Sequence, residues 1–248
     1  MKKLFGIVIL LALWQFGSTL TSPLFVPSPK SVWLALVALE AEGHLWTGLA
    51  YSFTRISVAA LLAIVVAVPT ALLICLNKTV DDIVSPVVSA MRYIPVTAFS
   101  PLLILWFGID EKMKVSFLFL ATFVYVLPTT ILCLKDVPDD LIDTGRTIGM
   151  NSFSIILEVL LPSALPSIAS SILMMYGIGW TYVAVIEAVN AKYGLGFIIN
   201  TSAARGKTDV VFAAIIAIVL FSYVFDKIGN FLIRRVFKWR YINDDPIE

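Results

Sequence analysis

Six long apolar runs constrain this chain more than any other feature of its sequence. They cover approximately residues 4–20, 49–76, 84–107, 115–134, 165–189 and 210–236. Each run is near the roughly 20 residues with which a helix crosses about 30 Å of hydrocarbon. The runs therefore predict an all-α integral membrane protein with about six transmembrane helices.

Composition points to the same class. Hydrophobic residues make up 59% of the chain and charged residues 14%, whereas soluble domains carry about 25% charged residues. No polar block is large enough for a soluble catalytic domain. We expect one transmembrane domain over residues 1–248, with an N-terminal helix and outer interfacial segment (1–48), a core of five helices (49–236) and a tail (237–248). The net charge of +1 indicates no particular partner, and no nucleic-acid partner is expected.

The two ends of the chain bear on processing and orientation. Lys2 and Lys3 precede the first apolar run, as in a signal peptide, but no small-residue cleavage site follows, so we expect an uncleaved helix. Basic residues between Arg234 and Arg240 follow the last run and favour the cytoplasmic side. Both termini and the loop 135–161 are then predicted to be cytoplasmic.

That loop has the pattern of a short helix. Pro138 suits a helix start, and acidic residues follow it where the helix dipole is positive. Asp143 can reach Arg146 three residues later. The face shared by Leu141, Gly145, Ile148 and Gly149 is apolar with two gaps, which a partner could approach closely. The alternative is an amphipathic connector lying on the bilayer.

The loop resembles the cytoplasmic signature of bacterial ATP-binding cassette (ABC) importer permeases. That signature is Glu-Ala-Ala, three residues, Gly, nine residues, then Ile-x-Leu-Pro. Here Gly149 is followed by nine residues and Val159-Leu160-Leu161-Pro162, so the spacing matches. Asp143-Thr144-Gly145 stands in place of Glu-Ala-Ala, and Gly145 lowers helix propensity by roughly 1 kcal/mol relative to Ala.

The resemblance extends over residues 27–236 and is nearest to the sulfonate, nitrate and taurine branch of these permeases. Six further segments carry it, together with Trp180 and Glu187 in the fifth run: Phe25–Pro29 with Val32-Trp33, Ser52–Arg55, Met91–Pro95, Leu105–Glu111, Pro162–Ile168 and Gly194–Gly196.

The resemblance implies a MetI-like permease fold and a definite set of partners. Two permease copies, expected to be identical, form a pore in the bacterial inner membrane. A dimer of ATPase subunits grips the cytoplasmic helix at 138–151, and an extracytoplasmic binding protein delivers the solute. ATP and Mg belong to the ATPase, so this chain is expected to bind no cofactor and to be no enzyme. The implied coupling residues are Asp143, Thr144, Gly145, Arg146, Gly149 and Pro162.

Charged and polar residues within the apolar runs are candidates for a pore or gate. Glu187 is an ionisable group inside a run, where such groups usually face a bundle interior or water. Trp180, Tyr182 and Asn190 lie near it along the helix. Its alternative is a structural carboxylate bonded to a neighbouring helix. Arg92 could attract an anion, although a bond to carbonyls freed near prolines is favoured.

Three prolines in the third run, at positions 86, 95 and 101, predict a broken or bent helix. Weaker motifs carry no function. His44 is the only histidine and lies in an expected interfacial helix, Ser31–Trp46, so it is interpreted as solvated and no metal site is expected. Gly206-Lys207-Thr208 ends like a phosphate loop, but Thr201 occupies the position where that loop needs glycine.

The sequence thus favours the permease subunit of an ABC importer for a small polar solute. The implied solute classes are sulfonates, taurine, nitrate, bicarbonate and pyrimidine-type precursors. The alternative is a secondary transporter driven by an ion gradient, which usually shows internal repeats. No convincing repeat relates residues 1–121 to 122–248. A membrane-embedded enzyme would need clustered acidic, His or Cys groups, which the apolar runs lack.

Overall fold

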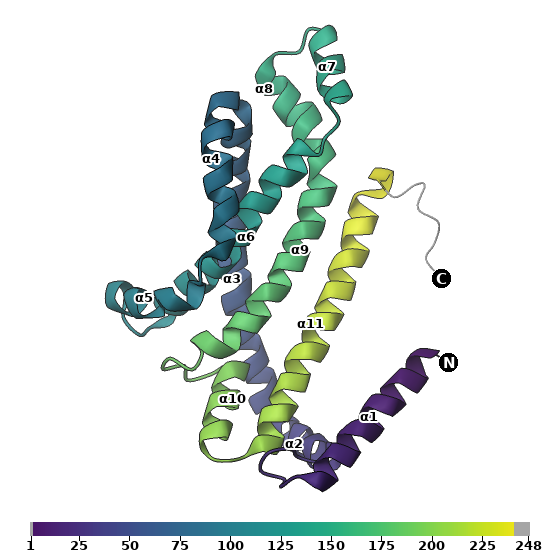
Figure 1. Cartoon of the computed structure of the whole chain (residues 1–248), viewed down its shortest axis with the longest axis vertical. Helices are drawn as coiled ribbons and strands as arrows, with labels where there is room; N and C mark the ends of the chain where they lie inside the picture. Colours follow the sequence, from purple (N-terminus) through teal and green to yellow (C-terminus); the bar gives the residue numbers. More distant parts are fainter. Residues whose placement is uncertain (1, 241–248) are drawn as a thin grey trace. The chain divides into compact units, whose positions relative to one another are not determined.

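The computed structural model describes residues 2–240, and its described part is helical with no β-strand (Figure 1). The all-α prediction is therefore confirmed. Within residues 2–240, four helices are long and apolar enough to cross a bilayer. They are α3 (His44–Leu76), α6 (Glu111–Lys135), the continuous helical stretch Ser152–Ile186 that ends in α9 (Leu161–Ile186), and α11 (Thr208–Val236).

A fifth span is formed by a broken pair of helices. α4 (Lys78–Ala90) and the short turn η1 (Met91–Tyr93) are bent by 86° from η2 (Val96–Phe99) and α5 (Ser100–Phe107). Pro95 stands at the break, and Ile94 before it is extended with φ −72° and ψ 121°. A residue that precedes proline is pushed out of the helical region, so the predicted break in the third run is confirmed.

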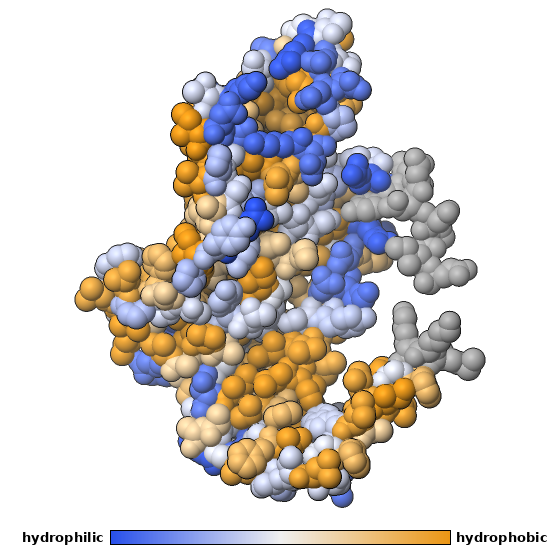
Figure 2. All heavy atoms as spheres, viewed as in Figure 1, coloured by the Kyte–Doolittle hydropathy of each residue, from blue (hydrophilic) through white to orange (hydrophobic). Residues whose placement is uncertain are grey.

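The first of the six expected spans is shorter than the others. α1 runs from Lys2 to Leu20, and its apolar part, Phe5–Leu20, is below the length of a crossing helix. The structure thus has four or five candidate spans instead of six. Hydrophobic side chains cover much of the visible surface of α1, whereas hydrophilic ones gather around α7 (Asp139–Thr147) and α8 (Ser152–Ser154) (Figure 2).

The chain divides into two compact units. Unit 1 comprises Met1–Arg55 with Trp180–Ser222, and unit 2 comprises Ile56–Gly179 with Tyr223–Glu248. The expected tail, 237–248, lies largely outside the described residues, which end at 240 with the turn η4 (Lys238–Arg240).

Unit 1 is organised around α2 (Pro29–Ala41) and α10 (Leu195–Ala204). The Ser28 hydroxyl accepts a hydrogen bond from the Ser31 N–H, and Pro29 occupies the first position of α2, which is a strong N-terminal cap. Its buried face packs on Ala213 of α11. α2 ends before Gly43, whose φ is +72°, and α3 then begins at His44. The expected single interfacial helix Ser31–Trp46 is therefore two helices, with Trp46 on α3.

Unit 2 has an apolar core between α3, α4, α6 and α9. The α3 contribution consists mainly of alanines, and Ala63, Ala67 and Ala71 are fully buried. Small residues of this kind let membrane helices approach closely. At the start of the unit, Gly179 of α9 lies so close to Ile56 of α3 that a Cβ would stand 2.7 Å from Ile56 Cγ2. At the other end, Lys135 Nζ lies 2.6 Å from Asp81 Oδ1 and ties α6 to α4.

The close approach at Gly179 predicts opposite effects for two neighbouring glycines. Gly179→Ala should destabilise the protein by about 1–3 kcal/mol, because the β-branched Ile56 side chain cannot move aside without straining the helix pair. Gly177→Ala is the matched control, because nothing lies within 4 Å of the added carbon and alanine gains up to about 1 kcal/mol of helix propensity. Thermal unfolding of the detergent-purified variants measures both. Equal shifts would contradict the close packing at Gly179.

Candidate functional site

The loop after α6 contains the helix that the sequence predicts. α7 spans Asp139–Thr147, Pro138 occupies its N-cap, and Asp139 and Asp140 lie in its first turn. The Arg146 guanidinium donates to Asp143 Oδ1 at 2.9 Å, and both side chains are exposed. The predicted helix start and the ion pair are confirmed.

The helix is shorter than the predicted 138–151 segment. It ends at Thr147 because Gly149 adopts φ +84°, the left-handed conformation with which glycine commonly terminates helices. The Met150 N–H then donates to the Gly145 carbonyl at 3.0 Å. A new helical stretch begins at Ser152, capped by the Asn151 side chain. Pro162 is exposed and lies inside this stretch, so the fifth span begins well before the expected residue 165.

Gly145 faces the chain itself and not the exposed side of α7. It is buried, and an added Cβ would stand 3.3 Å from Ile155 Cγ1 and 3.4 Å from Met150 Sδ. Ile155 begins η3 (Ile155–Leu160), a π-helical turn that leads into α9. One of the two expected gaps for a partner is thus filled by the chain's own side chains. Because residue 145 has no side chain, α7 lies directly against the start of the next span.

The exposed side of α7 mixes apolar and charged groups. Leu141 is 45% and Ile148 72% exposed. Thr144 is also exposed, as are the paired Asp143 and Arg146. Gly149 has nothing within 4 Å of where its Cβ would be, so the second expected gap is open. An exposed surface of this mixed composition is suited to docking on another protein. Because a helix of nine residues is marginal by itself, such docking also stabilises α7.

Glu187 lies at the centre of a second constellation, within unit 1. Its side chain is 1% exposed and follows directly after α9. Arg55 Nη1 donates to Oε1 at 2.7 Å, and the Ser52 hydroxyl lies 2.8 Å from Oε1 and 3.1 Å from Oε2. The Gly196 N–H donates to Oε2 at 2.8 Å. Because four donor contacts surround this buried carboxylate, we call the group of Ser52, Arg55, Glu187 and Gly196 the carboxylate clamp.

Glycines shape the backbone of the carboxylate clamp. Gly194 has φ +140°, and a Cβ there would collide with the Glu187 carboxylate. At Gly196 a Cβ would stand 2.7 Å from the Ala184 Cα. Arg55 Nη1 also donates to the Tyr193 carbonyl at 2.7 Å, and the Leu195 N–H donates to the Ser52 hydroxyl at 2.9 Å. The Gly194-Leu195-Gly196 motif is therefore the backbone that wraps the carboxylate at the start of α10.

The clamp favours the structural interpretation of Glu187 over a pore role. The other residues proposed with it have separate surroundings. Trp180 is 3% exposed and meets Phe221 edge-to-face, with ring centroids 5.3 Å apart. Tyr182 is half-buried, and Asn190 is exposed in a turn with φ +49°. The hydrogen bonds of the clamp come instead from Ser52, Arg55 and Gly196.

Arg92 is exposed and bonds locally. Its Nε donates to the Ser89 carbonyl at 2.9 Å, and its guanidinium lies 5.9 Å from the centre of the Tyr93 ring. The Ser89 carbonyl lies where α4 gives way to the 3₁₀ turn before Pro95, so the bond to a freed carbonyl is the interpretation that the geometry favours.

Sequence reasoning missed two buried cations. Arg55 is 4% exposed in the clamp, whereas the sequence marked it only as part of a segment that carries the family resemblance. Lys114 is 1% exposed, and its Nζ donates to the Ile109 carbonyl at 3.3 Å. Ser52 and Arg55, three residues apart at the start of a long apolar run, share a helix face. That polar face was the available signal, but its partner 132 residues away was not visible in the sequence.

No cluster of three potential metal ligands occurs in the described part of the chain. His44 is exposed, as expected, and its Nδ1 lies 3.1 Å from Glu42 Oε2. Gly206 and Lys207 lie in the turn between α10 and α11.

The carboxylate clamp predicts a strong effect of a nearly isosteric change. Glu187→Gln should destabilise the protein by about 3 kcal/mol or more, because Arg55 stays buried without a counter-charge. Adding Arg55→Gln should recover part of that loss, since it removes the uncompensated charge. The control Glu40→Gln changes an exposed carboxylate and should shift stability by less than about 0.5 kcal/mol. Fluorescence-detected thermal unfolding compares them, and equal effects of the two Glu→Gln changes would refute the clamp.

Known proteins resemble this chain over most of its length. The taurine transport system permease protein TauC of Escherichia coli strain K12 is 31% identical over 94% of this chain and 87% of its own length. A putative aliphatic sulfonates transport permease, SsuC of Bacillus subtilis strain 168, is 29% identical over 97% of this chain and 88% of its own length. The riboflavin transport system permease RibX of Chloroflexus aurantiacus is 29% identical over 94% of this chain and 88% of its own length.

Solved structures resemble the fold. An inward-facing form of the MetNI methionine ABC transporter superposes with a TM-score of 0.68 at 21% identity, covering 76% of this chain and 94% of that chain. The predicted MetI-like fold is thereby confirmed. The sequence profile of the binding-protein-dependent transport system inner membrane components matches residues 59–238, which include both α7 and the carboxylate clamp except for its α3 residues. The chain therefore belongs to this family of ABC importer permeases and is related to the taurine and aliphatic sulfonate permeases.

Proposed function

We propose that this permease carries a small organic anion of the sulfonate class, driven by a separate ATPase that docks on α7. The observation that carries the proposal is the exposed side of α7, braced from behind by Gly145 against η3. The relatives named for taurine and aliphatic sulfonates support the choice of solute. A relative named for riboflavin makes a vitamin-type solute the second candidate.

The bracing of α7 explains how the motion of a partner would enter the membrane domain. Gly145 packs on Ile155, and the Asn151 Oδ1 accepts from the Ser154 N–H at 2.8 Å. The contact between Gly145 and Ile155 joins α7 to the beginning of the long helical stretch, and the Asn151 cap fixes where that stretch starts. A push on α7 is therefore passed to the first turns of that stretch.

The partners follow from this mechanism. Asp143, Thr144, Arg146 and Gly149 contact the ATPase, whereas Gly145 supports the loop from within and the exposed Pro162 lies in the helical stretch that follows. ATP and Mg bind to the ATPase subunits. An extracytoplasmic binding protein delivers the solute, and a second copy of this chain completes the pore. Both termini lie on the cytoplasmic side of the inner membrane.

Docking on α7 predicts a selective loss of the ATPase. Ile148→Asp places a charge on the most exposed apolar residue of the α7 loop, and we expect at least a roughly tenfold drop in co-purified ATPase, since a desolvated charge in an interface costs several kcal/mol. The control Ile109→Asp makes the same change at a 48% exposed isoleucine between α5 and α6. It should keep the ATPase. Retention of the ATPase by the Ile148 variant would place the docking surface elsewhere.

The whole proposal is tested by purifying the tagged chain from its native membrane in mild detergent, with mass spectrometry of its partners. About one ATPase subunit per permease is expected. The purified complex, reconstituted with its binding protein, should then import labelled taurine or an alkanesulfonate only with ATP. Import of riboflavin instead would select the second solute. Uptake driven by an ion gradient by a chain that carries no ATPase would refute the mechanism.

A further inference from the structure

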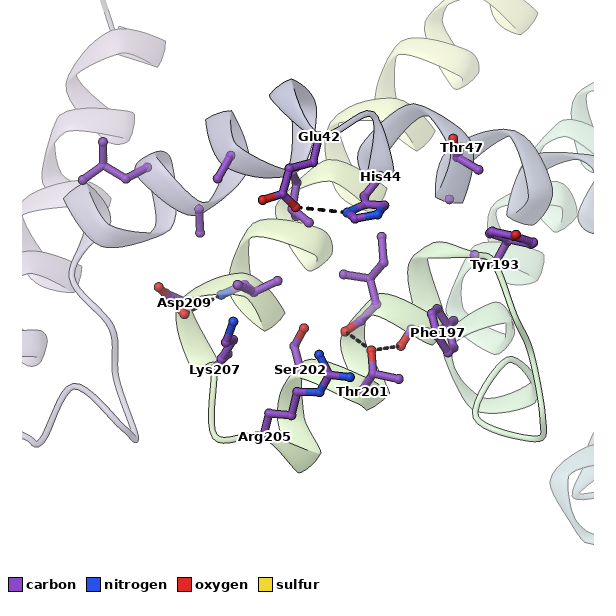
Figure 3. A pocket seen from close by; sticks show the side chains of 18 of the residues that line it. Glu42, His44, Thr47, Tyr193, Phe197, Thr201, Ser202, Arg205, Lys207 and Asp209 are labelled. Atoms are coloured by element: carbon purple, nitrogen blue, oxygen red, sulfur yellow. Dashed lines mark hydrogen bonds and ion pairs between the residues drawn. The ribbon is translucent and has the colours of Figure 1, made fainter.

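Unit 1 contains a hollow of about 740 Å³ outside the carboxylate clamp. It lies between the α2–α3 turn and the α10–α11 turn, and Figure 3 shows side chains of both turns facing each other across it. Binding sites for small molecules typically measure about 300–1,000 Å³. The hollow therefore has the size of a ligand site.

Part of the wall of the hollow is apolar. Leu34 and Leu39 line it from α2, and Phe197 and Ile198 line it from α10. Leu34 is 58% exposed although it is a large apolar residue, whereas Leu39, near the C-terminal end of the same helix, is buried. Such walls suit an alkyl or other apolar body.

The charged groups of the hollow are three cations, Lys192, Arg205 and Lys207, and two carboxylates, Glu42 and Asp209, so its lining has a net charge of +1 with His44 neutral. Arg205 and Lys207 come from the α10–α11 turn (Figure 3), and in the described part of the chain neither side chain has a hydrogen-bond or ion-pair partner. The two carboxylates of the lining are already engaged. Glu42 pairs with His44 at 3.1 Å, and Asp209 Oδ1 accepts from the Val210 N–H at 2.9 Å.

Hydroxyl groups accompany the two cations. Ser202 is 8% exposed and lies on the same side of the hollow as Arg205 (Figure 3). The Thr201 hydroxyl lies beside it and donates to the Phe197 carbonyl at 2.7 Å. The fork of a guanidinium binds two oxygens of a sulfonate, phosphate or carboxylate at once, and an ammonium and a hydroxyl add single bonds.

We infer that this hollow is a binding site for an amphipathic anion, with the oxyanion held by Arg205, Lys207 and Ser202 and the apolar body against α2 and α10. This inference rests on the proposed function for its choice of sulfonate as the probe. The head group of an anionic phospholipid has the same chemistry and is the other source of such a ligand.

The site lies next to the backbone segment that the carboxylate clamp holds in place. Tyr193 and Gly194 line the hollow. Arg55 holds the Tyr193 carbonyl, and Gly194 lies against the Glu187 carboxylate. A bound anion therefore contacts the same backbone segment that the clamp positions, which makes the site an accessory site next to a structural centre of unit 1.

The test is equilibrium binding of radiolabelled 1-hexanesulfonate to the permease–ATPase complex in phosphatidylcholine nanodiscs, without the binding protein. Saturable binding is expected for the native complex. The double variant Arg205→Gln with Lys207→Gln should weaken binding by roughly tenfold or more, since two charge-assisted contacts are lost. The control pair Lys30→Gln with Lys112→Gln removes the same charge from exposed residues outside the hollow and should leave binding unchanged.

A second variant tests the apolar wall. Ala38→Trp fills the hollow from α2 without changing its charge, and it should also abolish hexanesulfonate binding. Binding that survives the double variant, or that falls equally in the charge-matched control, would overturn the inference. Co-purification of the ATPase with each variant is measured in parallel. A complex that assembles and transports but shows no such binding would refute the accessory site and leave the proposed function standing.

Lipid is distinguished from free solute by the composition of the disc. If phosphatidylglycerol in the nanodisc displaces hexanesulfonate from the native complex, and the double variant no longer retains phosphatidylglycerol after purification, the site holds a lipid head group in the membrane. If phosphatidylglycerol has no effect, the site holds a free organic anion. Either result supports the inferred chemistry of the hollow.

Discussion

Backbone polar groups in hydrocarbon must find their hydrogen bonds inside the protein, and this requirement governs where the chain can depart from a helix. The described chain meets it mainly with four long continuous apolar helices. Departures occur at defined residues. At Pro95 the helix breaks by 86°, and Arg92 takes up the Ser89 carbonyl nearby. At Gly194–Gly196 the backbone turns around Glu187, whose carboxylate accepts from the Gly196 N–H. In both places a side chain replaces the bonds that the helix no longer makes.

Burial of charge is the second cost that the structure manages. Arg55 and Glu187 are almost fully buried and meet at 2.7 Å, with Ser52 and a backbone N–H occupying the remaining lone pairs. A buried ion pair of this kind is weak as a source of net stability, because desolvation offsets the attraction, but losing one partner is expensive. The clamp therefore acts as a device of specificity: it fixes which part of α3 meets the segment before α10.

The α7 loop shows how a departure from a motif can be compensated by packing. Gly145 lowers helix propensity where the family signature has alanine. In return it allows Ile155 and Met150 to lie against the α7 backbone. The ion pair between Asp143 and Arg146 is exposed and adds little stability. The position of α7 thus depends on contact with η3 more than on its own helix-forming tendency.

The sequence by itself determined the all-helical membrane class, a break or bend in the third run, the helix after Pro138 and the family resemblance, because each depends on residues close together in the chain. Apolar run length, proline chemistry and motif spacing are local properties. The exact bounds of the spans were harder to predict from the sequence. α1 has a shorter apolar part than its run suggested, and the helical stretch that ends in α9 begins at Ser152. Only the tertiary structure paired Arg55 with Glu187, turned Gly145 inward and buried Lys114. These depend on contacts between segments far apart in the chain, and a single sequence carries no signal of which polar residue will meet which.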